Sequence, residues 1–113
     1  MKRSDYESVL SLLRLREQRT GERLAKMQSV IDRLEGHAQA LRDMPRQRCD
    51  DVATAIMQDR FDRWRTEHLS TLGAQIARLN AAAQPERERH VRNVGRTNVM
   101  KRLYDERSGR RDR

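Results

Sequence analysis

The stretch that decides the fold is DYESVLSLLRLREQRTGERLAKMQSVIDRLEGHAQALRD, residues 5–43. It contains no proline, and the positions at alternating steps of four and three residues are mostly apolar. Nine of the eleven such positions are apolar, namely Tyr6, Leu10, Leu13, Leu24, Met27, Ile31, Leu34, Ala38 and Leu41. A repeat of about 3.5 residues places these side chains on one helix face and winds two helices around each other. Residues 1–44 are therefore predicted to form a coiled-coil helix, with a loosened seam at Glu17, Thr20 and Gly21.

A second apolar stripe follows after a short break. Because Pro45 disfavours helix in the residue before it, residues 45–50 are predicted to form a turn, with Asp50 or Asp51 capping the next helix. The second stripe consists of Met57, Phe61, Trp64, His68, Leu72, Ile76, Leu79 and Ala83. Two long striped helices with a short connection become antiparallel neighbours. The predicted fold is all-α, a single antiparallel coiled-coil hairpin.

The second helix is predicted to be the longer one, spanning residues 51–108, with a disordered tail at 109–113. Pro85 lies inside it, and we expect a kinked continuation rather than a separate helix. Val91, Val94, Val99 and Leu103 form a sparse apolar stripe toward its end, which suggests ordering against a partner.

The predicted turn also sets which residues face each other. The expected pairs are Tyr6 with Glu88, Ile31 with Trp64 and Leu41 with Ala53. With this pairing, everything beyond about His90 has no partner in the hairpin. Residues 86–113 hold ten Lys and Arg and five Asp and Glu. The sequence therefore predicts a basic C-terminal overhang.

The composition excludes several classes of protein. The chain has 113 residues, of which 37% are charged and 4% aromatic, and its net charge is +8, so it has little to bury in a compact core. No apolar run is long enough to span a membrane, and no secretory signal is visible. The single cysteine, Cys49, cannot form an intramolecular disulfide, which agrees with a reducing compartment. These features predict a cytoplasmic protein without membrane insertion.

No catalytic, cofactor-binding or metal-binding pattern is visible in the sequence. His37, His68 and His90 are isolated, and no two of them have the spacing that places two metal ligands on one helix face. Cys49 lacks a second thiol for a zinc site. We therefore expect a binding or mechanical protein that is not an enzyme and has no cofactor, metal or small-molecule substrate.

A few residues remain for partner binding. Leu12 and Leu15 fall off the heptad stripe and point outward. Phe61 and Trp64 either fill the core or form a partly exposed interaction anchor. A basic helix binds phosphates or an acidic protein surface. Interleaved acidic residues and the scarcity of aromatic side chains for stacking weigh against nucleic acid.

Residues 9–17, VLSLLRLRE, a hairpin of unequal arms, and the ending MKRLYDER at residues 100–107 together resemble the FliJ/YscO family. Its members are the central stalk of the export ATPase in flagellar and virulence type III secretion systems. The resemblance implies a stalk that inserts its terminal end into the hexameric export ATPase, activates it and links it to the export gate. It also implies a location at the cytoplasmic base of a membrane-bound secretion apparatus. Some members also bind export chaperones.

The resemblance assigns roles to residues by position. Contact with the ATPase falls on Leu12, Leu15, Arg16, Arg96, Arg102 and Arg107. Contact with the cytoplasmic domain of the export gate protein falls on Phe61, Trp64 and His68. Two other functions stay open, a basic helical hairpin that binds nucleic acid and a helical secretion chaperone or adaptor. Steep salt dependence of binding would mark the first, and binding of secreted substrates without an effect on ATP turnover would mark the second.

Overall fold

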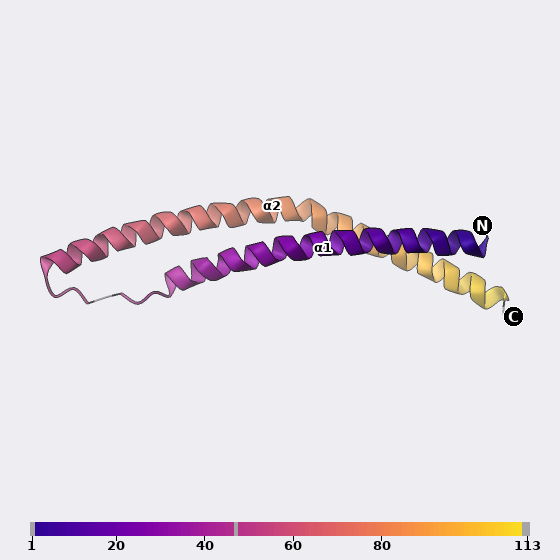
Figure 1. Ribbon diagram of the computed structural model, residues 1–113, viewed down its shortest axis with the longest axis horizontal. Helices are drawn as coiled ribbons and strands as arrows, with labels where there is room; N and C mark the ends of the chain where they lie inside the picture. Colours follow the sequence, from indigo (N-terminus) through magenta and orange to yellow (C-terminus); the bar gives the residue numbers. More distant parts are fainter. Residues whose placement is uncertain (1, 47, 112–113) are drawn as a thin grey trace. The chain divides into compact units, whose positions relative to one another are not determined.

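The computed structural model describes residues 2–46 and 48–111 and consists, over those residues, of two α-helices (Figure 1). Helix α1 spans Arg3–Arg42 and helix α2 spans Val52–Arg111. The predicted all-α fold, with a longer second helix, is confirmed. Residues 109–111 of the predicted disordered tail are helical, and residues 112–113 lie outside the described residues.

The heptad repeat of α1 is the stripe that this helix buries. All eleven heptad positions are partly or fully buried, including the polar Glu17 and Thr20. The most deeply buried of the large side chains is Ile31, which is 1% exposed. The local pattern of apolar residues therefore predicted which face of α1 packs against α2.

Helix α2 begins with Asp51 as its N-cap. The Thr54 backbone N–H donates to the Asp51 carboxylate at 2.6 Å, which satisfies a donor that has no partner within the helix. Hydrogen bonds from the Thr54 side chain, and then from its backbone, lower the pKa of Asp51 because they favour the charged carboxylate. The alternative cap, Asp50, instead pairs with Arg48 at 3.6 Å.

Contacts divide the chain into two compact units, each built from one segment of each helix. The terminal unit consists of Met1–Met27 and Ala83–Arg113, and the loop unit consists of Gln28–Ala82. Helix α2 continues through Pro85, so the expected continuation rather than a separate helix is confirmed. The terminal unit holds 17 Lys and Arg against nine Asp and Glu, whereas the loop unit holds eight of each. The entire net charge of +8 therefore belongs to the terminal unit.

The two segments of the terminal unit run antiparallel. Cross-helix contacts join Arg3 to Tyr104 (3.3 Å), Thr20 to His90 (2.8 Å) and Arg23 to Glu86 (3.4 Å). Near the chain ends, the Arg107 guanidinium lies 5.3 Å from the centre of the Tyr6 ring and donates to its hydroxyl at 3.5 Å. The expected pairing of Tyr6 with Glu88 is therefore wrong. The predicted basic overhang beyond His90 is also wrong, because this segment packs against the start of α1.

The connection between the helices, in the loop unit, explains why the expected pairing is wrong. Residues 43–51 separate the helices, and Arg46 in this connection pairs with Asp62 of α2 at 3.2 Å. Nine residues of extended chain reach up to about 30 Å, the length of about 20 helical residues, so the first turns of α2 lie beside the connection. The core of the unit is formed by Leu34, Ala38, Leu41, Leu69 and Leu72. The expected pairing of Leu41 with Ala53 is therefore wrong.

The centre of the terminal unit is polar. Thr20, Asn93 and Thr97 are all buried, at 6–7% exposure. The Thr20 Oγ1 lies 2.8 Å from Nδ1 of His90 and accepts a hydrogen bond from Asn93 Nδ2 at 3.5 Å. The seam that the sequence marked as weak at Thr20 is therefore filled by a hydrogen-bonded cluster rather than by apolar contacts.

We expect Gly21→Ala to stabilise the protein less than Gly36→Ala. Both glycines lie inside α1, where alanine is favoured over glycine by about 1 kcal/mol. A Cβ at Gly21 would come within 3.2 Å of Cε1 of His90, whereas a Cβ at Gly36 would meet nothing within 4 Å. Urea unfolding of both variants measures the difference in the free energy of unfolding.

The same substitutions in a His90→Ala background provide the control. Removal of the ring should restore the full gain at Gly21 and leave the gain at Gly36 unchanged. Equal gains at the two positions in the parent protein would contradict the close contact between the His90 ring and Gly21.

Candidate functional site

A groove lined by six arginines runs between the two helices of the terminal unit. It has a volume of about 400 Å³ and is lined by Arg16, Arg19, Thr20, Arg23, Arg89, Arg92, Asn93 and Arg96. We call it the arginine groove. The buried Thr20 and Asn93 have shorter side chains than the arginines that flank them. The arrangement therefore presents guanidinium groups from two helices around one concave surface.

The arginines come together because of matched spacing and antiparallel register. Each helix contributes three of them at steps of three and then four residues, which places each set on one helix face. The contacts of Thr20 with His90 and of Arg23 with Glu86 then bring the two sets to the same level. Three arginines of α1 thus lie across from three arginines of α2.

One carboxylate lies among these arginines. Glu86 forms ion pairs with Arg23 of α1 at 3.4 Å and with Arg89 of α2 at 3.1 Å. Its side chain is 17% exposed. Within the described residues, the other four arginines of the groove have no ion pair or hydrogen bond, namely Arg16, Arg19, Arg92 and Arg96. The groove therefore retains cationic groups that suit an anionic ligand.

The structure separates the six residues assigned to ATPase contact. Arg16 and Arg96 both line the arginine groove. Leu12 and Leu15 are exposed, at 54% and 43%. Arg102 is exposed but does not line the groove, and Arg107 packs on Tyr6 as described above. The sequence reasoning missed the other four arginines of the groove, although their repeated spacing was visible, because the expected register did not bring the two sets together.

The three residues assigned to the export gate do lie together in the loop unit. The Trp64 ring stacks on the His68 ring, with centres 5.2 Å apart and planes 10° apart. The Phe61 ring lies 5.7 Å from Trp64 in a tilted arrangement. Trp64 is 49% exposed, and His68 is exposed as well.

The predicted stripe is wrong where it includes Met57, Trp64 and His68, because these side chains face solvent. At this end of α2 the partly buried positions are instead Thr54, Gln58, Phe61, Asp62, Arg65 and Leu69. The prediction assumed that the large apolar side chains of Met57 and Trp64 face α1, but both are exposed. Trp64 and His68 therefore form an exposed aromatic surface.

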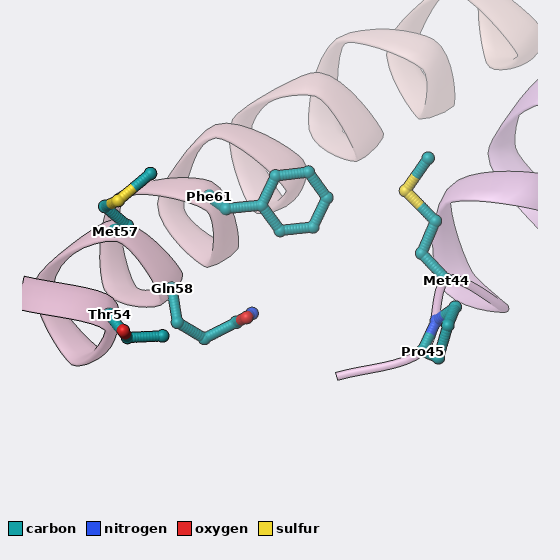
Figure 2. Close-up of a pocket in the computed structure, with 6 residues that line it drawn as sticks. All are labelled: Met44, Pro45, Thr54, Met57, Gln58 and Phe61. Atoms are coloured by element: carbon teal, nitrogen blue, oxygen red, sulfur yellow. The ribbon is translucent and has the colours of Figure 1, made fainter. Parts of the chain in front are cut away.

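A cavity of about 430 Å³ lies between the connection and the first turns of α2 (Figure 2). It is lined by Met44, Pro45, Thr54, Met57, Gln58 and Phe61. Figure 2 shows Phe61 projecting from α2 toward the connection, with Met44 and Pro45 across from it. The sequence pattern carries no signal for this cavity, because Met44 and Pro45 predict only the end of a helix and a turn.

The Arg46–Asp62 contact holds the connection beside this cavity. Hydrogen bonds to Asp62 from Arg46 and then from Gln58 lower the pKa of the Asp62 carboxyl, and the charges of Arg46 and Arg65 act in the same direction. The described part of the chain contains no cluster of three or more His, Cys, Asp or Glu that could hold a metal ion. In the same residues, neither helix has a stretch long and apolar enough to cross a membrane.

Comparison with known proteins finds no relative of this chain. No protein-family profile, no curated protein and no solved structure matches the chain.

We expect loss of the Asp62 charge to loosen the connection. A carboxyl group with a lowered pKa contributes stability above its ordinary pKa, and this contribution is lost as pH falls through the lowered value. Asp62→Asn at neutral pH, or acidification of the parent through the lowered pKa of Asp62, should therefore shift the methyl resonance of Met44, which lies across the cavity from the Phe61 ring.

Asp59→Asn is the matched control, because Asp59 pairs with Arg63 within α2 at 3.2 Å and this ion pair does not involve the connection. A Met44 resonance that responds equally to both substitutions would contradict a specific role of Asp62.

Proposed function

We propose that the protein is a non-enzymatic stalk or adaptor of a type III protein export apparatus, flagellar or virulence. The terminal unit binds and activates the hexameric export ATPase. The loop unit binds the cytoplasmic domain of the export gate protein, and export chaperones are further partners. The protein acts on the cytoplasmic side, at the base of the membrane-bound apparatus.

The observation that carries this proposal is that the net charge lies in one unit and the exposed Trp64–His68 ring pair lies in the other. The terminal unit carries the whole net charge of +8 and the arginine groove. The loop unit is neutral and presents the exposed aromatic pair of Trp64 and His68. Two surfaces of such different chemistry suit two different partners, because charged grooves select oppositely charged partners and exposed aromatic side chains anchor interfaces.

The two-helix architecture gives further support. Antiparallel helical segments joined by a connection are what the FliJ/YscO resemblance implies, and both chain ends belong to the unit that the proposal assigns to the ATPase. A single asymmetric coiled coil inside a six-fold ring meets the six subunits unequally. This inequality can bias their catalytic states, which is how a non-enzymatic stalk activates an ATPase.

We expect Arg16→Glu combined with Arg96→Glu to weaken ATPase stimulation by about tenfold or more, the size of effect typical of an interface hot spot. These arginines line the groove and have no ion pair in the described structure, so their reversal does not break an internal contact. The measurement is ATP turnover by the cognate export ATPase with each variant at matched salt. Circular dichroism checks that the helices remain folded. Undiminished stimulation by the folded variant would contradict the assignment of the terminal unit to the ATPase.

We expect Trp64→Ala combined with His68→Ala to impair binding to the export gate protein and to leave ATPase stimulation unchanged. The two rings are exposed and stack on each other, so their loss removes a surface feature rather than the core. Affinity for the purified cytoplasmic domain of the gate protein is the readout. A variant that stimulates the ATPase poorly but still binds the gate protein would reverse the roles of the two units.

A further inference from the structure

The arginine groove continues into exposed apolar residues that keep the same helical spacing. The row on α2 reads Arg89, Arg92, Arg96, Val99 and Leu103, at alternating steps of three and four residues. The row on α1 reads Leu12, Arg16, Arg19 and Arg23, at steps of four, three and four. Three apolar members of these rows are largely exposed: Leu12 at 54%, Val99 at 56% and Leu103 at 44%. Each helix thus presents a row with a cationic part and an apolar part.

The two rows lie alongside each other in the same sense. In the antiparallel register set by Thr20 and His90, Leu12 of α1 falls near the level of Val99 of α2. The apolar parts of both rows are therefore on the same side of the arginines. The surface forms one continuous track, cationic at one end and apolar at the other.

We infer that this track docks one acidic amphipathic α-helix of a partner protein. A helix lying between α1 and α2 would repeat the geometry that the two helices already share, in which side chains three and four residues apart line one face. Carboxylates at steps of three and four residues rise by about 10 Å over seven residues, as the arginines of each row do. Each turn of the partner helix can then place a carboxylate against guanidinium groups, while its apolar end covers Leu12 and Val99.

Glu86 shows that two arginines of the groove, one from each helix, pair with a single carboxylate. Its side chain accepts ion pairs from Arg23 of α1 and Arg89 of α2, so guanidinium groups from both helices reach one carboxylate. Arginine binds carboxylates strongly because its planar donors match the two oxygens. The four arginines without an ion pair in the described structure would provide the same chemistry for carboxylates of the incoming helix.

The surface fits an acidic helix better than a nucleic acid. No aromatic side chain lines the groove, so bases have nothing to stack on. The negative charge of Glu86, beside Arg23 and Arg89, would repel a phosphate backbone that runs along the groove. The apolar continuation at Leu12, Val99 and Leu103 matches apolar side chains of a helix and offers nothing to phosphates.

This inference names the partner chemistry at the surface assigned to the ATPase, and it rests on the proposed function only for the identity of the protein that carries the helix. The test therefore uses a synthetic probe. The probe is a labelled helical peptide of about three heptads, with glutamates at steps of three and four residues followed by leucines in the same register. A second peptide of the same composition has the residues scrambled around the helix.

The 113-residue protein should bind the patterned peptide about tenfold or more tightly than the scrambled one, as measured by fluorescence anisotropy at physiological salt. Arg19→Glu combined with Arg92→Glu should abolish this preference. The matched control is Arg14→Glu combined with Lys101→Glu, which changes the net charge equally but lies in a different groove, lined also by Glu17 and Thr97. Leu12→Ser combined with Val99→Ser should weaken binding without any change of charge. Circular dichroism of each variant checks the fold.

Three outcomes would overturn the inference. Equal losses in the groove variant and the control variant would mean that only net charge matters. Equal binding of the patterned and scrambled peptides would mean that no helix is recognised. Tighter binding of an oligothymidylate of the same charge than of the patterned peptide would mean that the surface serves nucleic acid. If the peptide binds as expected and the export ATPase does not respond to the protein, the inference stands and the proposed function falls.

Discussion

The structure depends on the register that the polar contact between Thr20 and His90 sets across the helices of the terminal unit. The two side chains meet at 2.8 Å, and Asn93 adds a hydrogen bond to the same hydroxyl. A shift of one heptad would place the imidazole opposite Leu13 or Met27 and leave polar atoms against apolar side chains. Burial of a polar group without a partner is costly, so buried polar contacts select one register among those that apolar packing allows.

The arginine groove follows from that register. The triplets of arginine on the two helices have identical spacing, but they form one surface only when they lie at the same level. Their mutual repulsion costs stability, and the carboxylate of Glu86 offsets part of it through Arg23 and Arg89. The concentration of like charge is therefore maintained by contacts deeper in the seam rather than by the arginines themselves.

The sequence predicted the burial pattern of α1 because a heptad is a local property, and all eleven expected positions are buried to some degree. It could not predict the pairing, because heptads match again after every shift of seven residues. Loop length was the remaining guide, and it was misleading because the first turns of α2 lie beside the connection. In α2, His90, Asn93 and Thr97 take the inner positions while Val91 and Val99 face solvent, a reversal that apolar periodicity alone cannot reveal. The cavity near Met44 could not be predicted either, because residues of the connection form one side of it and helix periodicity does not describe them.

The two units also differ in what holds them together. Among the described residues, those buried in the loop unit are all apolar: Ile31, Ala38, Leu41 and Leu72. In the terminal unit, three of the five buried residues are polar: Thr20, Asn93 and Thr97. The terminal unit therefore gains less from the hydrophobic effect and carries more repulsion among its cations. A partner helix that covers Leu12 and Val99 and neutralises the groove supplies both missing contributions. Since a ligand that binds only the folded form stabilises that form, docking and ordering of the terminal unit become one linked equilibrium.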